Sequence, residues 1–159
     1  MMVWGEGMDE ITFVIAEGLK GLNNAAVDLV MKGDLDEAER VFESIENTAK
    51  MFQYNDGVGA ARVSMANLSM MRGDIIQALT HIEIAVEKCS GSNKEEACAM
   101  QKKVSMIALQ KGMEKEKEGE LKGALELFER ILPHMNEKRA AAVSKEIESI
   151  KAYLKDTKG

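Results

Sequence analysis

Few side chains in this sequence have the types and spacing that enzyme chemistry requires. Its 159 residues include two histidines, His81 and His134, and two cysteines, Cys89 and Cys98. A histidine needs a partner group to act as a general acid or base. His81 is expected beside a buried helix face, and His134 follows a proline at a helix end. The sequence lacks a glycine-rich phosphate loop, a GxSxG motif and metal-spaced His/Glu motifs. We therefore expect no catalytic residue, no metal site and no cofactor.

The cysteines are expected to be reduced. Their spacing matches neither a CxxC pair nor a four-ligand metal set, and small apolar residues at a helix junction fit it better. The opening residues MMVWGEGMDE lack the basic region of a signal peptide, and the apolar run ITFVIAEGL that follows is too short to cross a bilayer. The sequence therefore predicts a cytoplasmic protein.

Charge and composition narrow both the partners and the fold. The formal net charge of −6 repels nucleic-acid backbones and anionic lipid surfaces. We expect no nucleic-acid or membrane partner, and we expect a protein or peptide partner that is, if anything, basic. Aromatic residues make up only 4% of the chain and there is one proline, which is typical of an all-α protein.

The elements that must position any binding residues follow from an internal repeat. GDLDEAERVFESI, from Gly33, aligns with GDIIQALTHIEIA, from Gly73, and GELKGALELFERI, from Gly119; the glycines are 40 and 46 positions apart. Similar residues recur at fixed offsets after each glycine: an aliphatic residue at two (Leu35, Ile75, Leu121), alanine at five (Ala38, Ala78, Ala124), a bulky apolar residue at nine (Phe42, Ile82, Phe128) and an apolar residue at twelve (Ile45, Ala85, Ile131). Self-similarity on this scale indicates stacked helical units.

These offsets predict two helices joined at each glycine. Glycine commonly closes a helix, and the acid that follows it can cap the next helix by accepting amide hydrogen bonds. The offsets of five, nine and twelve differ by four and three, which places those residues on one buried helix face. A small residue stands seven positions before each glycine (Ala26, Ala66 and Gly112). We expect these small residues to mark the closest approach of the paired helices.

The predicted helices extend well beyond the repeat motif. The second helix keeps its apolar face through Phe42, Ile45, Ala49 and Phe52. Upstream of Gly33, one face is shared by Ile11, Ile15, Gly18, Leu22, Ala25 and Leu29. Because glycine weakens a helix interior, Gly18 and Gly21 leave open whether this stretch is one helix or two. Tyr54, at a turn between units, is expected to be either packed or exposed.

The small residue followed after seven positions by Gly-Asp, then an aliphatic residue, alanine and an aromatic residue resembles the tetratricopeptide repeat (TPR) family, in its longer form. The lead-in NDGVGAARVSMANLSMMRGD is similar to that of the longer members. The resemblance implies an α-solenoid of antiparallel helix pairs, with units at about 19–58, 59–104 and 105–135 of a single domain that spans 9–156. Residues 136–156 are expected to form a capping helix that begins at Asn136. Residues 1–8 are expected to form a flexible tail in which Trp4 has no evident partner.

The resemblance also implies a concave groove, lined by the first helix of each unit, that holds an extended peptide or a helix from a partner. The residues placed there are Asn23, Val27, Met31, Val63, Ser64, Asn67, Met70, Met71, Met106, Leu109, Gln110 and Met113. Methionine adapts to different apolar side chains, and amides can bond a peptide backbone. Methionine at helical spacing is also common core filler, so the spacing leaves open whether these side chains are exposed or packed.

The expected function is a non-enzymatic protein-interaction scaffold. One subset of the family binds a C-terminal carboxylate through lysine, asparagine and arginine, but the matching positions contain no cation: Asn23, Val27, Ser64, Met106 and Gln110. That mode of recognition is therefore not expected. The alternatives are self-association, for example as a homodimer, through exposed apolar surface of the terminal helices, and a ligand sensor or enzyme of unfamiliar type.

Overall fold

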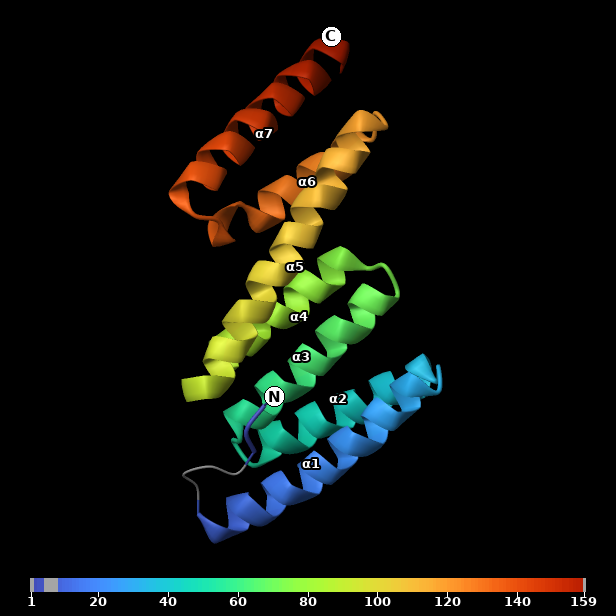
Figure 1. The fold of residues 1–159 in the computed structure, drawn as a ribbon, viewed down its shortest axis with the longest axis vertical. Coiled ribbons are helices and arrows are strands. Elements are labelled where there is room, and N and C mark those ends of the chain that lie inside the picture. The colour runs from blue at the N-terminus through green and yellow to red at the C-terminus, as the bar shows by residue number, and fades with distance from the viewer. Residues whose placement is uncertain (1, 5–8, 159) are drawn as a thin grey trace. The chain divides into compact units, whose positions relative to one another are not determined.

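The computed structural model describes residues 2–4 and 9–158, and within them the fold is entirely helical. Its elements are α1 (Glu10–Met31), α2 (Leu35–Met51), α3 (Asn55–Met71), α4 (Ile75–Lys88), α5 (Gly91–Lys117), α6 (Leu121–Ile131), the short 3-10 helix η1 (Leu132–His134) and α7 (Glu137–Lys158) (Figure 1). No β-strand occurs among the described residues, which confirms the all-α prediction. Gly18 and Gly21 lie inside α1, so this stretch is one helix.

The chain divides into two compact units, and each is described by itself. The first, Met1–Gln101, contains α1 to α4 and the start of α5; the second, Lys102–Gly159, contains the rest of α5 and all that follows. In the first unit each of α1 to α3 packs against the next helix, and α1 also contacts α3. In the second unit α6 packs against α7, and η1 contacts both. Neighbours in the sequence are therefore neighbours in space, as short connections require.

Three of the connections share one backbone geometry that favours glycine. Gly33, Gly73 and Gly119 have φ values of +85°, +77° and +81°, a region that other residues rarely adopt. In each case the amide of the next residue donates to a carbonyl of the last helical turn: Asp34 to Leu29 at 2.9 Å, Asp74 to Ser69 at 2.8 Å and Glu120 to Lys115 at 2.8 Å. The repeat glycines therefore close their helices as predicted.

The connection between α2 and α3 has the same geometry without a glycine. Gln53 has a φ of +54°, and the Tyr54 amide donates to the carbonyl of Ala49 at 2.8 Å. A residue with a Cβ costs roughly 1–2 kcal/mol in this conformation. This fourth turn joins the helix pair α1–α2 to the pair α3–α4, in a part of the chain where the repeat motif itself is absent.

The acids after the glycines cap their helices less often than predicted. Asp74 accepts a hydrogen bond from the Gln77 amide at 3.1 Å. Asp34 and Glu120 make no such bond, so the prediction is wrong at these two positions. The longer Glu120 side chain reaches back to Lys115 instead, with the two charged groups 3.1 Å apart.

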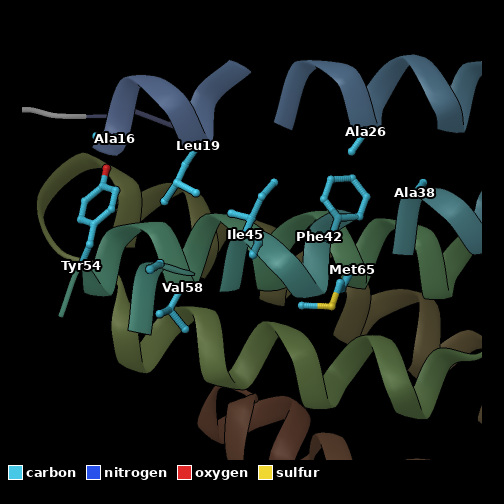
Figure 2. Close-up of a cluster of buried hydrophobic side chains, with 11 residues drawn as sticks. Ala16, Leu19, Ala26, Ala38, Phe42, Ile45, Tyr54, Val58 and Met65 are labelled. Atoms are coloured by element: carbon cyan, nitrogen blue, oxygen red, sulfur yellow. The ribbon is translucent and has the colours of Figure 1, made fainter. Parts of the chain in front are cut away.

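Each predicted hairpin is closed by a small residue that lies together with the bulky residue sixteen positions later. The three pairs are Ala26 with Phe42, Ala66 with Ile82, and Gly112 with Phe128. Ala26 and Phe42 belong to one buried apolar cluster, and Figure 2 shows Ala26 facing the Phe42 ring. At Gly112 the approach is closer still, because a Cβ there would lie 2.6 Å from Cε1 of Phe128. The small residues therefore mark the close approaches that the spacing predicts.

In the first unit the predicted face of α1 is wrong except at Ile15 and Leu29, which pack against the core, and the predicted face of α2 is wrong only at Phe52. The buried residues of α1 are Ala16, Leu19 and Ala26, whereas Ile11, on the predicted face, is 73% exposed. Helix α1 packs mainly against α2 and also contacts α3, and most of its residues are exposed. Phe52 is also exposed, because α2 ends at Met51 and the chain turns there.

The predicted capping helix forms in the second unit as α7. Asn136 caps it by accepting a hydrogen bond from the Arg139 amide at 2.9 Å. Val143, Ile147 and Ile150 of α7 are buried, and their spacing of four and three positions places them on one face of the helix. They contribute to the core of this unit together with Ala124, Leu127, Phe128 and Ile131 of α6.

Candidate functional site

Two of the predicted groove residues meet where α1 contacts α3. The Ser64 hydroxyl donates to Oδ1 of Asn23 at 3.3 Å, and both side chains are half-buried. This contact brings the predicted binding faces of α1 and α3 side by side. Val63, on the same part of α3, packs against the buried cluster that contains Ala66 and Ile82.

Four predicted residues on these two helices present their side chains to solvent. Val27 is 42%, Met31 81% and Met71 59% exposed, and Asn67 is exposed beside them on α3. Met70 is half-buried. The question of whether the methionines are packed therefore has a different answer at each position. Met31 and Met71 are available for contact, and Met70 is only partly so.

The other four predicted residues lie on α5 in the second unit, where two of them border a cavity of about 290 Å³. Leu109 and Met113 line it together with Phe128, Ala142 and Val143, so most of its wall is apolar. Gln110 is exposed nearby on α5. Met106 lies outside this cavity, and its sulfur accepts a hydrogen bond from Nη1 of Arg139 at 2.9 Å.

Two carboxyl groups and one cation complete this cavity. Glu116 and Glu146 line it, as does Arg139. Burial, followed by the hydrogen bond with the Glu146 carboxyl and that group's charge, raises the pKa of Glu116 to about 6. Two carboxyl groups can share a hydrogen bond only while one of them holds a proton. Spacing along the chain gave no sign of this pair, because the two acids are on different helices.

A polar cluster of α2, α3 and α4 was not predicted. Arg62 makes two hydrogen bonds to the Glu46 carboxylate, one of them from Nη2 to Oε1 at 3.0 Å, and its Nη1 lies 2.9 Å from Nδ1 of His81. Burial, and then the Arg62 charge, lower the pKa of His81. The imidazole is therefore held neutral, so that its Nδ1 can accept from the guanidinium. These groups satisfy one another, which identifies the cluster as a structural one.

Residues 2–4 make defined contacts with the first unit, unlike the flexible tail expected there. Asn93 accepts a hydrogen bond from the Val3 amide at 2.6 Å and donates one to the Val3 carbonyl at 2.8 Å. The rings of Trp4 and Tyr54 meet edge to face, with centroids 6.0 Å apart. Met2 packs against the cluster that contains Ala66 and Ile82. Residues 1 and 5–8 lie outside the described residues.

Asn93 is the one residue of this contact that sequence reasoning missed altogether. Its side chain is 4% exposed, and its two polar atoms both bind the backbone of Val3, 90 positions away. A buried side-chain amide needs hydrogen-bond partners, and the Val3 backbone supplies them. A distant backbone segment leaves no local pattern that could predict the contact.

Comparison of the chain with protein-family models, with curated proteins and with solved structures finds no match. Within the part of the chain that the structure describes, no helix has both the length and the apolar character needed to cross a membrane. Cys89 and Cys98 are both free thiols, as expected, and burial raises the pKa of Cys89 to about 12.

Proposed function

We propose that this chain is a non-enzymatic, TPR-like α-solenoid scaffold that binds an extended or helical peptide of a partner protein. The binding surface is the face of α1 and α3 that carries Val27, Met31, Asn67 and Met71. The observation that carries the proposal is the exposure of three apolar side chains beside an exposed amide on two helices that contact each other. The three equivalent glycine turns and their matched close approaches support the repeat architecture.

The chemistry of this face suits a peptide. Full burial of a Met or Val side chain contributes roughly 1.5–3 kcal/mol of free energy. A partner's apolar residue that covers these side chains would therefore stabilise the complex. Asn67 can bond a peptide backbone at the same time, and flexible methionines adapt to more than one apolar shape. The net charge of −6 favours a basic partner, and two free cysteines suit the reducing cytoplasm.

The test replaces Asn67→Ala and Met71→Glu together in the full chain. Partners are captured with the native chain as bait, identified, and titrated against both forms by calorimetry. We expect the double variant to bind at least about tenfold more weakly, because a buried charge replaces an apolar contact. The control is Met51→Glu, which places the same charge on another exposed methionine, at the end of α2. Unchanged binding by the double variant, or equal loss in the control, would contradict the groove assignment.

Self-association is the second candidate, and one observation favours it. Ile11, Phe13 and Val14 are exposed in the first turns of α1, as an apolar patch of the kind that often marks a contact. Light scattering over a range of concentrations distinguishes the two candidates. A chain that stays monomeric at high concentration excludes self-association and leaves the peptide-binding proposal.

A further inference from the structure

The contact between Met2–Trp4 and the first unit has the form of peptide recognition. Val3 offers both its amide and its carbonyl to one side-chain amide, at 2.6 and 2.8 Å. A residue presents both groups to the same side when the backbone is extended, as in a paired β-strand. The Asn93 side chain therefore binds the backbone of Val3 as a neighbouring β-strand would. These two hydrogen bonds do not depend on the side chain at position 3.

The residues on either side of Val3 supply the side-chain contacts. Trp4 packs against the core cluster that contains Tyr54, and Met2 packs against the separate cluster that contains Ala66 and Ile82. The segment thus places an apolar residue, a backbone anchor and an aromatic residue in succession across the starts of α3 and α5. With the segment in place Tyr54 and Asn93 are only 5% and 4% exposed, so the helices and the segment together cover both residues.

We propose that Tyr54, Asn93 and the adjoining apolar clusters form a binding site for an extended peptide of the pattern apolar, any residue, aromatic, and that Met2–Trp4 occupies this site as a built-in competitor. A partner segment with the same pattern displaces residues 2–4. The identity of that partner rests on the proposed function, but the site itself does not. Two hydrogen bonds, one ring contact and the packing of Met2 and Trp4 hold the described part of the segment, and these are the contacts that an incoming peptide replaces.

The occupied state can be observed directly, because Trp4 is the only tryptophan in the chain. Val3→Pro removes the amide hydrogen that Asn93 accepts, and it lies outside every helix. We expect Trp4 emission to shift to longer wavelength and its quenching by acrylamide to rise in this variant and in Asn93→Ala. The matched control, Asn67→Ala, changes an exposed asparagine of α3 and is expected to leave both readings unchanged. Unchanged Trp4 emission in both Val3→Pro and Asn93→Ala would overturn the proposal.

The site itself is tested with a synthetic peptide of residues 1–9, MMVWGEGMD. Calorimetry compares the native full chain with the full chain carrying Val3→Pro and Trp4→Ala, which empties the site. We expect the emptied form to bind at least about tenfold more tightly, because a tethered segment competes at a high effective concentration. Adding Asn93→Ala to the emptied form, or replacing the peptide's tryptophan with alanine, is expected to abolish that gain. Circular dichroism confirms that each variant keeps its helices.

Two further outcomes overturn the inference: an emptied form that does not bind the peptide, and binding that survives Asn93→Ala. Neither outcome depends on the exposed face of α1 and α3. A full chain carrying Asn67→Ala and Met71→Glu is expected to give the same peptide results as the native chain. Failure of this site and failure of the proposed function are therefore separate results.

Discussion

In the first unit the buried carboxylate of Glu46 faces a cation, Arg62, whereas in the second unit Glu116 faces another carboxylate, Glu146. The first arrangement is complete: the guanidinium also binds His81, and Lys50 pairs with Glu46 at 3.3 Å. The second arrangement needs a proton to be stable, and it borders an apolar cavity. The first unit thus contains a cluster of paired opposite charges, and the second contains a carboxyl pair that shares a proton.

The largest expected effect breaks the complete cluster. Arg62→Ala leaves Glu46 buried without its main partner, and we expect the free energy of unfolding to fall by about 3 kcal/mol. Urea denaturation followed by circular dichroism measures it. Arg72→Ala is the control, because Arg72 pairs with Asp36 at 2.6 Å and with Glu39 at an exposed site. That loss should stay below about 1 kcal/mol. Equal losses from the two variants would show that the buried Glu46 cluster contributes no more to the free energy of unfolding than the exposed ion pairs of Arg72.

The next effect compares the close approaches of the helices. Gly112→Ala would place a Cβ 2.6 Å from the Phe128 ring, and we expect it to lower the free energy of unfolding by about 1–3 kcal/mol. Adding Phe128→Leu should recover part of this loss by making room. The control is Gly21→Ala, which has no atom near its new Cβ and lies inside α1. There the same change should stabilise the chain by about 0.5–1 kcal/mol. Denaturation midpoints separate the two, and a stabilising Gly112→Ala would rule out the predicted contact.

The two units are also expected to respond to pH in opposite directions. The pKa of His81 is lowered from 6.5, so the folded first unit disfavours the imidazolium. Its contribution to stability is full above pH 6.5 and is lost as the pH falls below that value. The pKa of Glu116 is raised from 4.5 to about 6, so its contribution is full below pH 4.5 and is lost as the pH rises through 6.

Hydrogen exchange resolved by residue measures both trends at pH 5, which lies below 6.5 and between 4.5 and 6, and at pH 7, which lies above both ranges. We expect Glu116→Gln to remove the pH dependence in α6 and α7 and to stabilise them at pH 7 by up to about 1 kcal/mol, since the site is partly solvated. His81→Gln should remove the opposite trend in α2 to α4. Parallel trends in the two units would contradict this assignment of the two clusters.

The smallest effect concerns the fourth turn. Gln53→Gly should raise the free energy of unfolding by about 1 kcal/mol, because glycine adopts the φ of +54° without steric cost. Gly73→Gln, the reverse change at a turn of the same geometry, should lower it by a similar amount. Thermal melting of both variants tests the pair. If both changes shift the melting temperature in the same direction, the equivalence of the four turns is wrong.

The features that could be predicted from the sequence are the local ones. The repeat motif acts within one hairpin: it combines a left-handed glycine with a small residue seven positions before it and a bulky residue nine positions after it. Its spacing therefore predicts the contact between Gly112 and Phe128 directly. The Asn136 cap depends on a residue only three positions away. These short-range constraints are sufficient to predict the all-α fold and its helix pairs.

The rest depends on contacts between distant segments. The Val3–Asn93 hydrogen bonds join positions 90 apart, and the Arg62–Glu46 and Arg62–His81 contacts join different helices. The exposed face of α1 could not be predicted either, because its apolar pattern offers two possible faces and only packing against α2 and α3 selects one. For the candidate site, the sequence indicated the faces of α1 and α3 but not which of their methionines reach solvent.

The glycine turns have a consequence for the length of such a chain. Gly33 and Gly73 hold the same backbone conformation and are preceded and followed by equivalent contacts. A chain from which residues 34–73 were excised would join two ends of matching geometry, and Ala26 would meet Ile82 where it now meets Phe42. The turns are therefore equivalent junctions: removal or duplication of the segment between them would leave the same glycine turn at the joint.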